Sequence, residues 1–301
     1  MQNTDTFNYG DPRLPMYTNI PFYIGILKDK CYGIFHHNSF PGTVNFGAGN
    51  VRFMSVSHEG GDADYFFFHD DDPSGIITAY TSVTGRTPLP PLWSLGFHQS
   101  RCSYYNESQV MDIAEDFRRK GIPLDCIVLD ADYLVDYKPF VRSHRIAFGS
   151  GNEPWSYGEI PEGIAKTYIG LRYRMLPYIY SQFERSTRDG MPLSRSLCVD
   201  HPYDSKVYDK RYQYEYLFGP SVLVAPAIPG EPVTPIYLPE GEWHEIYSGE
   251  ILEGGRELSS RYPDCQLPLF VKGSSIIPMQ SLTAAFSTLW RTSEATTRKG
   301  F

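Results

Sequence analysis

Two acidic side chains, Asp130 and Asp132, lie two positions apart directly after a continuous apolar run, Cys126 to Leu129. Carboxyl groups can accept hydrogen bonds or transfer protons. If the chain stays extended, alternation directs both side chains to the same side, about 6.6 Å apart at the backbone for a rise of about 3.3 Å per residue. Two carboxyl groups on one side do not readily approach a substrate from opposite faces, so this pair alone does not predict an acid–base couple.

Two further polar side chains stand at the end of another short run. His98 and Arg101 follow Trp93 to Phe97, which we interpret as a buried strand. The carboxyl ends of strands carry functional groups in barrel enzymes, so both residues are candidates for lining a site. Structural pairing with the strand Cys126 to Leu129 is an equally good interpretation of both residues.

A strand, a helix and a second strand must position these side chains. The helix is predicted over Asn106 to Lys120, with Asn106 as its N-cap, Gly121 just past its end and one apolar face, made by Val110, Ile113, Ala114 and Phe117. The run Cys126 to Leu129 is typical of a strand buried on both faces of a parallel sheet. Strand, helix and strand in this order predict a βα unit of a doubly wound sheet or a barrel.

The rest of the chain is divided around this unit. Residues 1–83 and 191–280 alternate short apolar runs with turn residues, which predicts β-sandwich pieces. Prolines make residues 84–91 a stiff connector, and a long helix over residues 164–185 should kink at Pro177. We therefore expect an N-terminal β-sandwich fragment (1–83), a truncated (β/α) barrel segment (84–190), a C-terminal β-sandwich (191–280) and a disordered tail (281–301).

Composition argues against several classes of function. The formal net charge of -8 disfavours nucleic-acid binding, which depends on clustered Lys and Arg. No run approaches about 18 apolar residues and the first ten residues do not form a signal peptide, so we expect no membrane partner and favour a cytoplasmic location. Five widely spaced cysteines without a CxxC pair predict free thiols, and we expect neither a metal nor another cofactor.

Several segments resemble glycoside hydrolase family 31, and they follow the order of that family. TGRTPLPPLWSLGFHQSRCSYY (84–105) and GIPLDCIVLDADYLVDYKPF (121–140) resemble the opening of its catalytic barrel. NTDTFNYG (3–10) resembles the end of its N-terminal sandwich, and VRSHRIAFGSGNEPWSYGE (141–159) resembles a later barrel segment. The resemblance implies an α/β plus all-β fold, in which a partial (β/α)8 TIM barrel is flanked by N-terminal and C-terminal β-sandwich pieces, and a retaining α-glucosidase activity in intact members.

The resemblance also assigns substrate-binding roles to three residues. Asp130 would accept hydrogen bonds from sugar hydroxyls next to the cleaved bond, and His144 would hydrogen-bond the same sugar. Asp5 would reach the site from an N-terminal loop, although a loop so close to the start of the chain can fray. As an alternative, His144 could be a solvated side chain between Arg142 and Arg145.

Three other residues have a structural interpretation beside a functional one. Asp132 is interpreted as a structural carboxylate near the strand end, although it could line the site. Glu153 and Trp155 belong to a segment that resembles a family loop near the site, and we interpret both as scaffold. Trp155 is also a candidate stacking platform for a sugar ring.

The chain departs from the family pattern in the middle of the barrel. In the family, the units that bear the aspartate nucleophile and the aspartate acid/base follow the LDADY-like strand, whereas here Phe140 runs directly into Val141, which resembles a late barrel strand. Pro91 to Gly190 supplies 100 positions, against about 250 for a complete barrel. We therefore expect no catalytic residues, little or no hydrolysis, weak binding of an α-glucoside or maltooligosaccharide at most, and self-association through exposed barrel edges.

Two other functions remain as alternatives. The chain could be a non-catalytic carbohydrate-binding or partner-binding protein that uses its sandwich surfaces. A minimal hydrolase would have to pair Asp130 with Glu153 or Asp132. Retaining hydrolysis requires two opposed carboxyl groups about 5 to 5.5 Å apart, and this requirement disfavours the second alternative.

Overall fold

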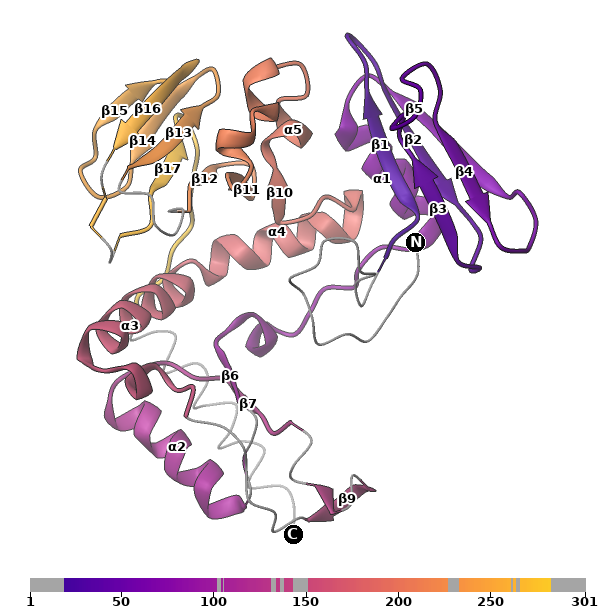
Figure 1. The fold of residues 1–301 in the computed structure, drawn as a ribbon. Helices are drawn as coiled ribbons and strands as arrows, with labels where there is room; N and C mark the ends of the chain where they lie inside the picture. The colour runs from indigo at the N-terminus through magenta and orange to yellow at the C-terminus, as the bar shows by residue number, and fades with distance from the viewer. Residues whose placement is uncertain are drawn as a thin grey trace. The chain divides into compact units, whose positions relative to one another are not determined.

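The computed structural model describes residues 19–101, 104, 106–130, 134–135, 138–142, 151–226, 233–260, 262–263 and 266–282. The chain forms two compact units, each of which can be followed in Figure 1. Unit 1 comprises Met1–Arg86, Asp189–Met191 and Ser196–Gln213, and unit 2 comprises Thr87–Arg188, Pro192–Arg195 and Tyr214–Phe301. Asp5, Asp132 and His144 lie outside the described residues, as does nearly all of the tail.

Unit 1 is built on a three-stranded antiparallel sheet. Its strands β1 (Phe22–Ile26), β2 (Cys31–His36) and β5 (Tyr65–Asp70) occur in the order β1-β2-β5, and β3 (Gly42–Asn45) pairs with β4 (Ser55–His58) in a separate hairpin. Helix α1 (Pro73–Thr84) packs on one face, where Ile76 is fully buried and Tyr80 stacks on Phe22 with ring centroids 3.9 Å apart. Three short elements of the later segment complete the unit: α5 (Leu197–Asp200), η4 (Ser205–Tyr208) and η5 (Lys210–Tyr212).

The sequence did not predict α1. Its residues, PSGIITAYTSVT, are rich in β-branched types, which favour strands and weaken a prediction of helix. Pro73 stands at the first helical position, where its missing N–H costs nothing, and burial of Ile76 against the sheet supplies the stabilisation that propensity lacks. Tertiary packing therefore decides the conformation of this segment.

Unit 2 contains one complete βαβ element. Strand β6 (His98–Ser100) pairs in parallel with β7 (Cys126–Val128), and α2 (Glu107–Arg119) connects them. The Asn106 side chain accepts a hydrogen bond from the Gln109 N–H at 2.8 Å, and Gly121 follows the helix with a φ of +64°. The predicted caps are thus confirmed, and the glycine allows the left-handed turn that ends the helix.

The prediction of a strand over Trp93 to Phe97 is wrong. Leu92–Leu95 form a 3-10 helix, η1, and the strand begins only at His98. Strand β7 lies where it was predicted, but it is not buried on both faces, because Val128 is 45% exposed. Within the described residues, β7 has β6 as its only parallel neighbour, so apolar side chains that a full sheet would cover remain partly exposed.

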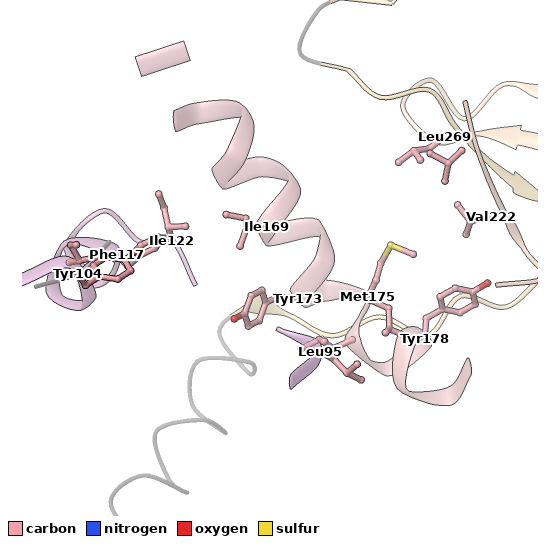
Figure 2. Packing of buried hydrophobic residues seen from close by; sticks show 14 residues of the cluster. Leu95, Tyr104, Phe117, Ile122, Ile169, Tyr173, Met175, Tyr178, Val222 and Leu269 are labelled. Carbon is pink, nitrogen blue, oxygen red and sulfur yellow. The ribbon is translucent and has the colours of Figure 1, made fainter. Parts of the chain in front are cut away.

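Two consecutive helices replace the single long helix that the sequence predicted. Helix α3 (Glu159–Arg174) ends at Met175 and α4 (Leu176–Asp189) follows directly; η3 (Pro154–Tyr157) precedes α3. The break lies two residues before Pro177. The proline ring clashes with a backbone carbonyl of the preceding helical turn, and its nitrogen has no hydrogen to donate to the helical hydrogen bond. The helices, α2 and the C-terminal sheet share one core, which includes Phe117, Tyr173 and Leu269 (Figure 2).

The C-terminal part of unit 2 is all-β, as expected. A six-stranded sheet has the order β10 (Ser194–Ser196), β11 (Tyr216–Phe218), β12 (Val222–Val224), β17 (Leu269–Lys272), β14 (Glu242–Glu245) and β15 (Ile251–Glu253). A second sheet pairs β13 (Thr234–Leu238) with β16 (Arg256–Ser260). Trp243 is fully buried, and its indole N–H donates to the Pro239 carbonyl oxygen at 2.8 Å.

The described residues contain no closed barrel. After β7 the chain forms a two-stranded antiparallel hairpin, β8 (Leu134–Val135) with β9 (Lys138–Arg142), and the junction between Phe140 and Val141 lies within β9. The architecture is therefore α/β plus all-β, with a partial barrel between β-rich parts, as the sequence predicted. In the part of the chain that the structure describes, none of the helices combines the length and the apolar character that a membrane crossing requires.

Candidate functional site

The carboxyl ends of β6 and β7 position the first group of candidate residues. Ser100 lies opposite Val128 in the parallel register, so the two strands end at the same edge. Arg101 leaves from β6 at this edge, and Asp130 follows β7 by two residues with an exposed side chain. Asp130 has a φ of +62°, a left-handed conformation that costs energy for a residue with a side chain and occurs frequently at functional sites.

Arg101 is held in a buried ion pair with Glu153. One terminal nitrogen of Arg101 lies 2.8 Å from Glu153 Oε1, and their side chains are only 13% and 3% exposed. The Ser156 hydroxyl donates to Glu153 Oε2 at 3.2 Å, and the Arg101 guanidinium lies 4.7 Å from the centre of the Tyr104 ring. Glu153 is therefore a scaffold residue that fixes the 151–157 segment to the strand edge, and neither charge of this pair is free to act on a substrate.

His98 does not share this edge. It is the first residue of β6 and lies opposite Cys126, at the amino end of the strand pair, rather than after a strand end as the sequence predicted. Its exposed ring stacks on Trp93, with centroids 6.0 Å apart and planes 19° apart. The error follows from assigning Trp93 to Phe97 to a strand.

Trp155 packs against α2. Its ring meets Phe117 edge to face with centroids 4.7 Å apart, and the Lys120 ammonium lies 5.4 Å from its ring centre. The half-buried ring is thus held between α2 residues on two sides, Phe117 and Lys120. These contacts agree with the scaffold interpretation of this residue.

A second polar cluster was not predicted from the sequence. The Tyr173 hydroxyl donates to the Asp125 carboxylate and accepts from the Phe97 N–H at 3.1 Å. Burial raises the pKa of Asp125, and burial together with the Asp125 hydrogen bond raises the pKa of Tyr173. A Cβ at Gly96 would lie 1.6 Å from the Asp125 carboxylate, so only glycine fits there. The cluster joins α3 to the amino ends of the strand pair, and its role is structural.

Family comparisons match the chain along most of its length. Three models of glycoside hydrolase family 31 match in the order of the family's domains: the N-terminal galactose mutarotase-like domain over residues 1–45, the TIM-barrel domain over residues 87–138 and 136–182, and the C-terminal domain over residues 190–277. The barrel model matches in two segments that meet at residues 136–138. These residues lie close to the Phe140–Val141 junction.

Individual relatives agree with this assignment. Alpha-glucosidase 2 of Bacillus thermoamyloliquefaciens is 40% identical over 141 residues, which cover 46% of this chain and 18% of the relative. An alpha-xylosidase of Saccharolobus solfataricus is 35% identical over 143 residues, which cover 47% of this chain and 19% of the relative. The matched region thus spans about a fifth of the length of these curated relatives.

Solved structures show the same fold. The family 31 dextranase FjDex31A of Flavobacterium johnsoniae, complexed with glucose, has a TM-score of 0.82 at 18% identity and covers 93% of this chain and 64% of its own. A cycloalternan-degrading enzyme from Trueperella pyogenes has a TM-score of 0.78 at 12% identity and covers 91% of this chain and 73% of its own. The three domain models, which match most of the chain in the family's order, show that the chain belongs to glycoside hydrolase family 31 and contains a fragment of its catalytic barrel.

Proposed function

We propose that this chain is a family 31 α-glucosidase-like protein that retains part of the sugar-binding pocket but does not hydrolyse α-glucosides by itself. The observation that carries the proposal is that the barrel model matches in two segments, 87–138 and 136–182, which together span 96 residues, against about 250 for a complete barrel. The β8–β9 hairpin occupies the corresponding position, where a complete barrel would continue with further strand and helix units. The resemblance to the family implies that the units bearing the nucleophile and the acid/base, which follow the LDADY-like strand in intact members, are missing here.

The described carboxyl groups near Asp130 do not replace the missing pair. Glu153 is buried against Arg101 and Ser156 and cannot attack a sugar without breaking a buried ion pair. Asp125 lies at the amino end of β7 and accepts a hydrogen bond from the Tyr173 hydroxyl. An extended chain of five residues would place it about 16 Å from Asp130. A retaining mechanism needs its two carboxyl groups about 5 to 5.5 Å apart, so the separation disfavours Asp125 as the partner of Asp130, and the buried ion pair disfavours Glu153.

Asp130 is the residue that we assign to sugar binding among the described ones. Its exposed carboxylate at the carboxyl end of β7 stands where barrel enzymes bind their substrates. His144 and Asp5, which lie outside the described residues, would contribute to the same subsite. Without the rest of the barrel to enclose the ligand, an α-glucoside or maltooligosaccharide would bind weakly, since little ligand surface is buried.

Turnover of an aryl α-glucoside and of maltose by the full chain tests this proposal. We expect no product above that formed by an Asp130→Asn variant prepared in the same way, because hydrolysis needs an opposed carboxyl pair and the described residues offer no partner for Asp130. Circular dichroism of both proteins would establish that they are equally folded. Turnover by the unaltered chain that exceeds the Asp130→Asn value would refute the proposal.

A second candidate function, non-catalytic carbohydrate binding, is favoured by an exposed aromatic face of unit 1. On the sheet face opposite α1, Tyr32 and Phe67 stack with ring centroids 6.1 Å apart, and Tyr65 and Phe67 are 59% and 60% exposed. Aromatic rings of this kind can stack on the apolar faces of sugars. The face could therefore bind a glucan chain without any catalysis.

Calorimetric titration with maltose distinguishes this candidate from a sugar site at Asp130. Binding at the aromatic face should be weakened by Tyr65→Ala and not by Tyr214→Ala, a matched control that removes a tyrosine of similar exposure, 55%, in unit 2. Binding that is lost in Asp130→Asn but kept in Tyr65→Ala would exclude the aromatic face.

A further inference from the structure

An apolar cavity of about 310 Å³ lies in unit 2, between the helices α3 and α4 and the six-stranded sheet. Figure 2 shows Met175 at the break between these helices, on the side of Val222 and Leu269. These three residues line the cavity together with Val224. This volume is at the lower end of the range of about 300 to 1,000 Å³ that is usual for ligand pockets. At about 30 Å³ for each water-sized group, the cavity has room for about ten such groups.

Among the residues that line the cavity, Arg172 alone carries a charge. Its Nε donates to the Leu95 carbonyl oxygen at 2.8 Å, and among the described residues no carboxylate forms an ion pair with it. The side chain is half-buried, and burial lowers its pKa. The Nε also lies 3.4 Å from the Gly96 carbonyl oxygen, and these neutral acceptors leave the charge of the guanidinium without a described anionic partner. This part of the wall therefore offers a positive charge to an anionic ligand.

The wall contains a second polar group, the hydroxyl of Tyr216. The Tyr216 hydroxyl has no hydrogen bond to any other described residue, and burial raises its pKa, which keeps the hydroxyl protonated and able to donate. The remaining side chains of the wall are mostly aliphatic or aromatic. This composition does not suit a sugar, whose hydroxyl groups would each need a hydrogen-bond partner.

We propose that the cavity binds a small amphiphilic carboxylate, with the apolar body between the helices and the sheet and the carboxylate at Arg172. A guanidinium recognises a carboxylate through charge-assisted hydrogen bonds, and these are strengthened where the surroundings exclude water. The Tyr216 hydroxyl is a second donor in the same wall. The site uses none of the residues that carry the sugar-binding proposal, so the two proposals can fail independently.

Calorimetric titration of the full chain with decanoate, decanol and decylammonium tests the proposal without altering the protein. These probes share a ten-carbon body of about the size of the cavity and differ in the charge of the head group. We expect saturable one-to-one binding of decanoate, binding of decanol weaker by about tenfold or more, and the weakest binding for decylammonium. Absence of decanoate binding, or equal binding of all three probes, would overturn the proposal.

Two matched valine substitutions locate the site. Val224→Phe places a larger side chain at the cavity wall and should weaken decanoate binding by about tenfold or more. Val233→Phe makes the same change at a residue that is 42% exposed and does not line the cavity, and it should leave binding unchanged. Equal affinities in the two variants would place the bound decanoate elsewhere.

Arg172→Met tests the head group separately. Methionine keeps most of the apolar stem and removes the charge, so the variant should bind decanoate and decanol with similar affinity. A preference for decanoate that persists in this variant contradicts the assignment of the carboxylate to Arg172. If Val224→Phe or Arg172→Met fails to fold, as judged by circular dichroism, the three probes on the unaltered chain still test whether a carboxylate is preferred.

Discussion

Glu215 is a buried carboxyl group in unit 2 whose replacement by glutamine should change how stability depends on pH. Its side chain is only 7% exposed. Oε1 accepts a hydrogen bond from the Tyr237 N–H at 2.9 Å, and Oε2 has no partner among the described residues. Burial without a compensating cation raises the pKa of this carboxyl group to about 8. The folded protein therefore keeps Glu215 protonated at pH 7, while the unfolded chain ionises it.

The sign and size of the effect follow from this pKa difference. Below the unfolded pKa of 4.5, both states are protonated and Glu215 imposes no pH-dependent cost. As the pH rises towards about 8, the unfolded state releases a proton that the folded state retains, so the free energy of unfolding falls. At about 1.36 kcal/mol per pH unit, the chain should lose about 2.5 kcal/mol between pH 5 and pH 7.

Thermal unfolding at several pH values measures this effect. A loss of about 2.5 kcal/mol corresponds to a fall of roughly 5 to 10 °C in the Tm of a unit of this size. Glu215→Gln should lack this part of the pH dependence, because an amide does not titrate in this range. Glu240→Gln removes an exposed carboxyl group of the same unit and serves as the matched control. Parallel pH profiles for the unaltered chain and Glu215→Gln would refute the reasoning.

Three further substitutions test the framework of unit 2. Gly96→Ala should destabilise the fold by about 2 to 4 kcal/mol in urea unfolding, because its Cβ would clash with the Asp125 carboxylate. Arg101→Met should cost about 3 to 5 kcal/mol by leaving Glu153 buried and unpaired, whereas replacing both residues by methionine should cost less than Arg101→Met alone. Val128→Lys should reduce concentration-dependent association in sedimentation velocity, since this partly exposed valine ends a strand that lacks the neighbours of a full sheet.

Each of these three predictions has its own control. Gly163→Ala changes a helical glycine whose added Cβ would meet no atom within 4 Å, so it should be neutral or slightly stabilising; an equal loss of stability in both glycine variants contradicts the clash at Gly96. The Arg101 prediction fails if the double variant is as unstable as Arg101→Met. Val83→Lys introduces the same charge at a valine of similar exposure, 47%, in unit 1, and it should leave association unchanged.

Local sequence signals predicted the elements whose ends are marked by specific residues. Helix α2 was predicted to within one residue at each end, because Asn106 caps its start and Gly121 supplies the left-handed turn after it. Strand β1 (Phe22–Ile26) is one of the short apolar runs expected within residues 1–83. In these segments local propensity and tertiary packing favour the same conformation, so a single sequence is sufficient.

Sequence patterns failed where packing overrides local preference or where partners are far apart in the chain. The β-branched residues of α1 suggested strands, and the apolar run at Trp93 suggested a strand where the chain forms a 3-10 turn. Arg101 and Glu153 are 52 positions apart, and Tyr173 and Asp125 are 48 apart, so their pairing could not be read from spacing. The sugar-binding role of Asp130 was assigned through family resemblance and stays a prediction; its left-handed backbone became visible only in the structure.

Covalent labelling tests most directly whether this chain has a glycosidase nucleophile. A retaining enzyme forms a glycosyl-enzyme intermediate, which a slow substrate such as 5-fluoro-α-glucosyl fluoride allows to accumulate. Intact-protein mass spectrometry of the full chain after incubation with this compound should show an unchanged mass if, as we propose, the chain lacks the barrel segment that bears the nucleophile. A stoichiometric gain of one fluoroglucosyl group on an Asp or Glu side chain would contradict the account.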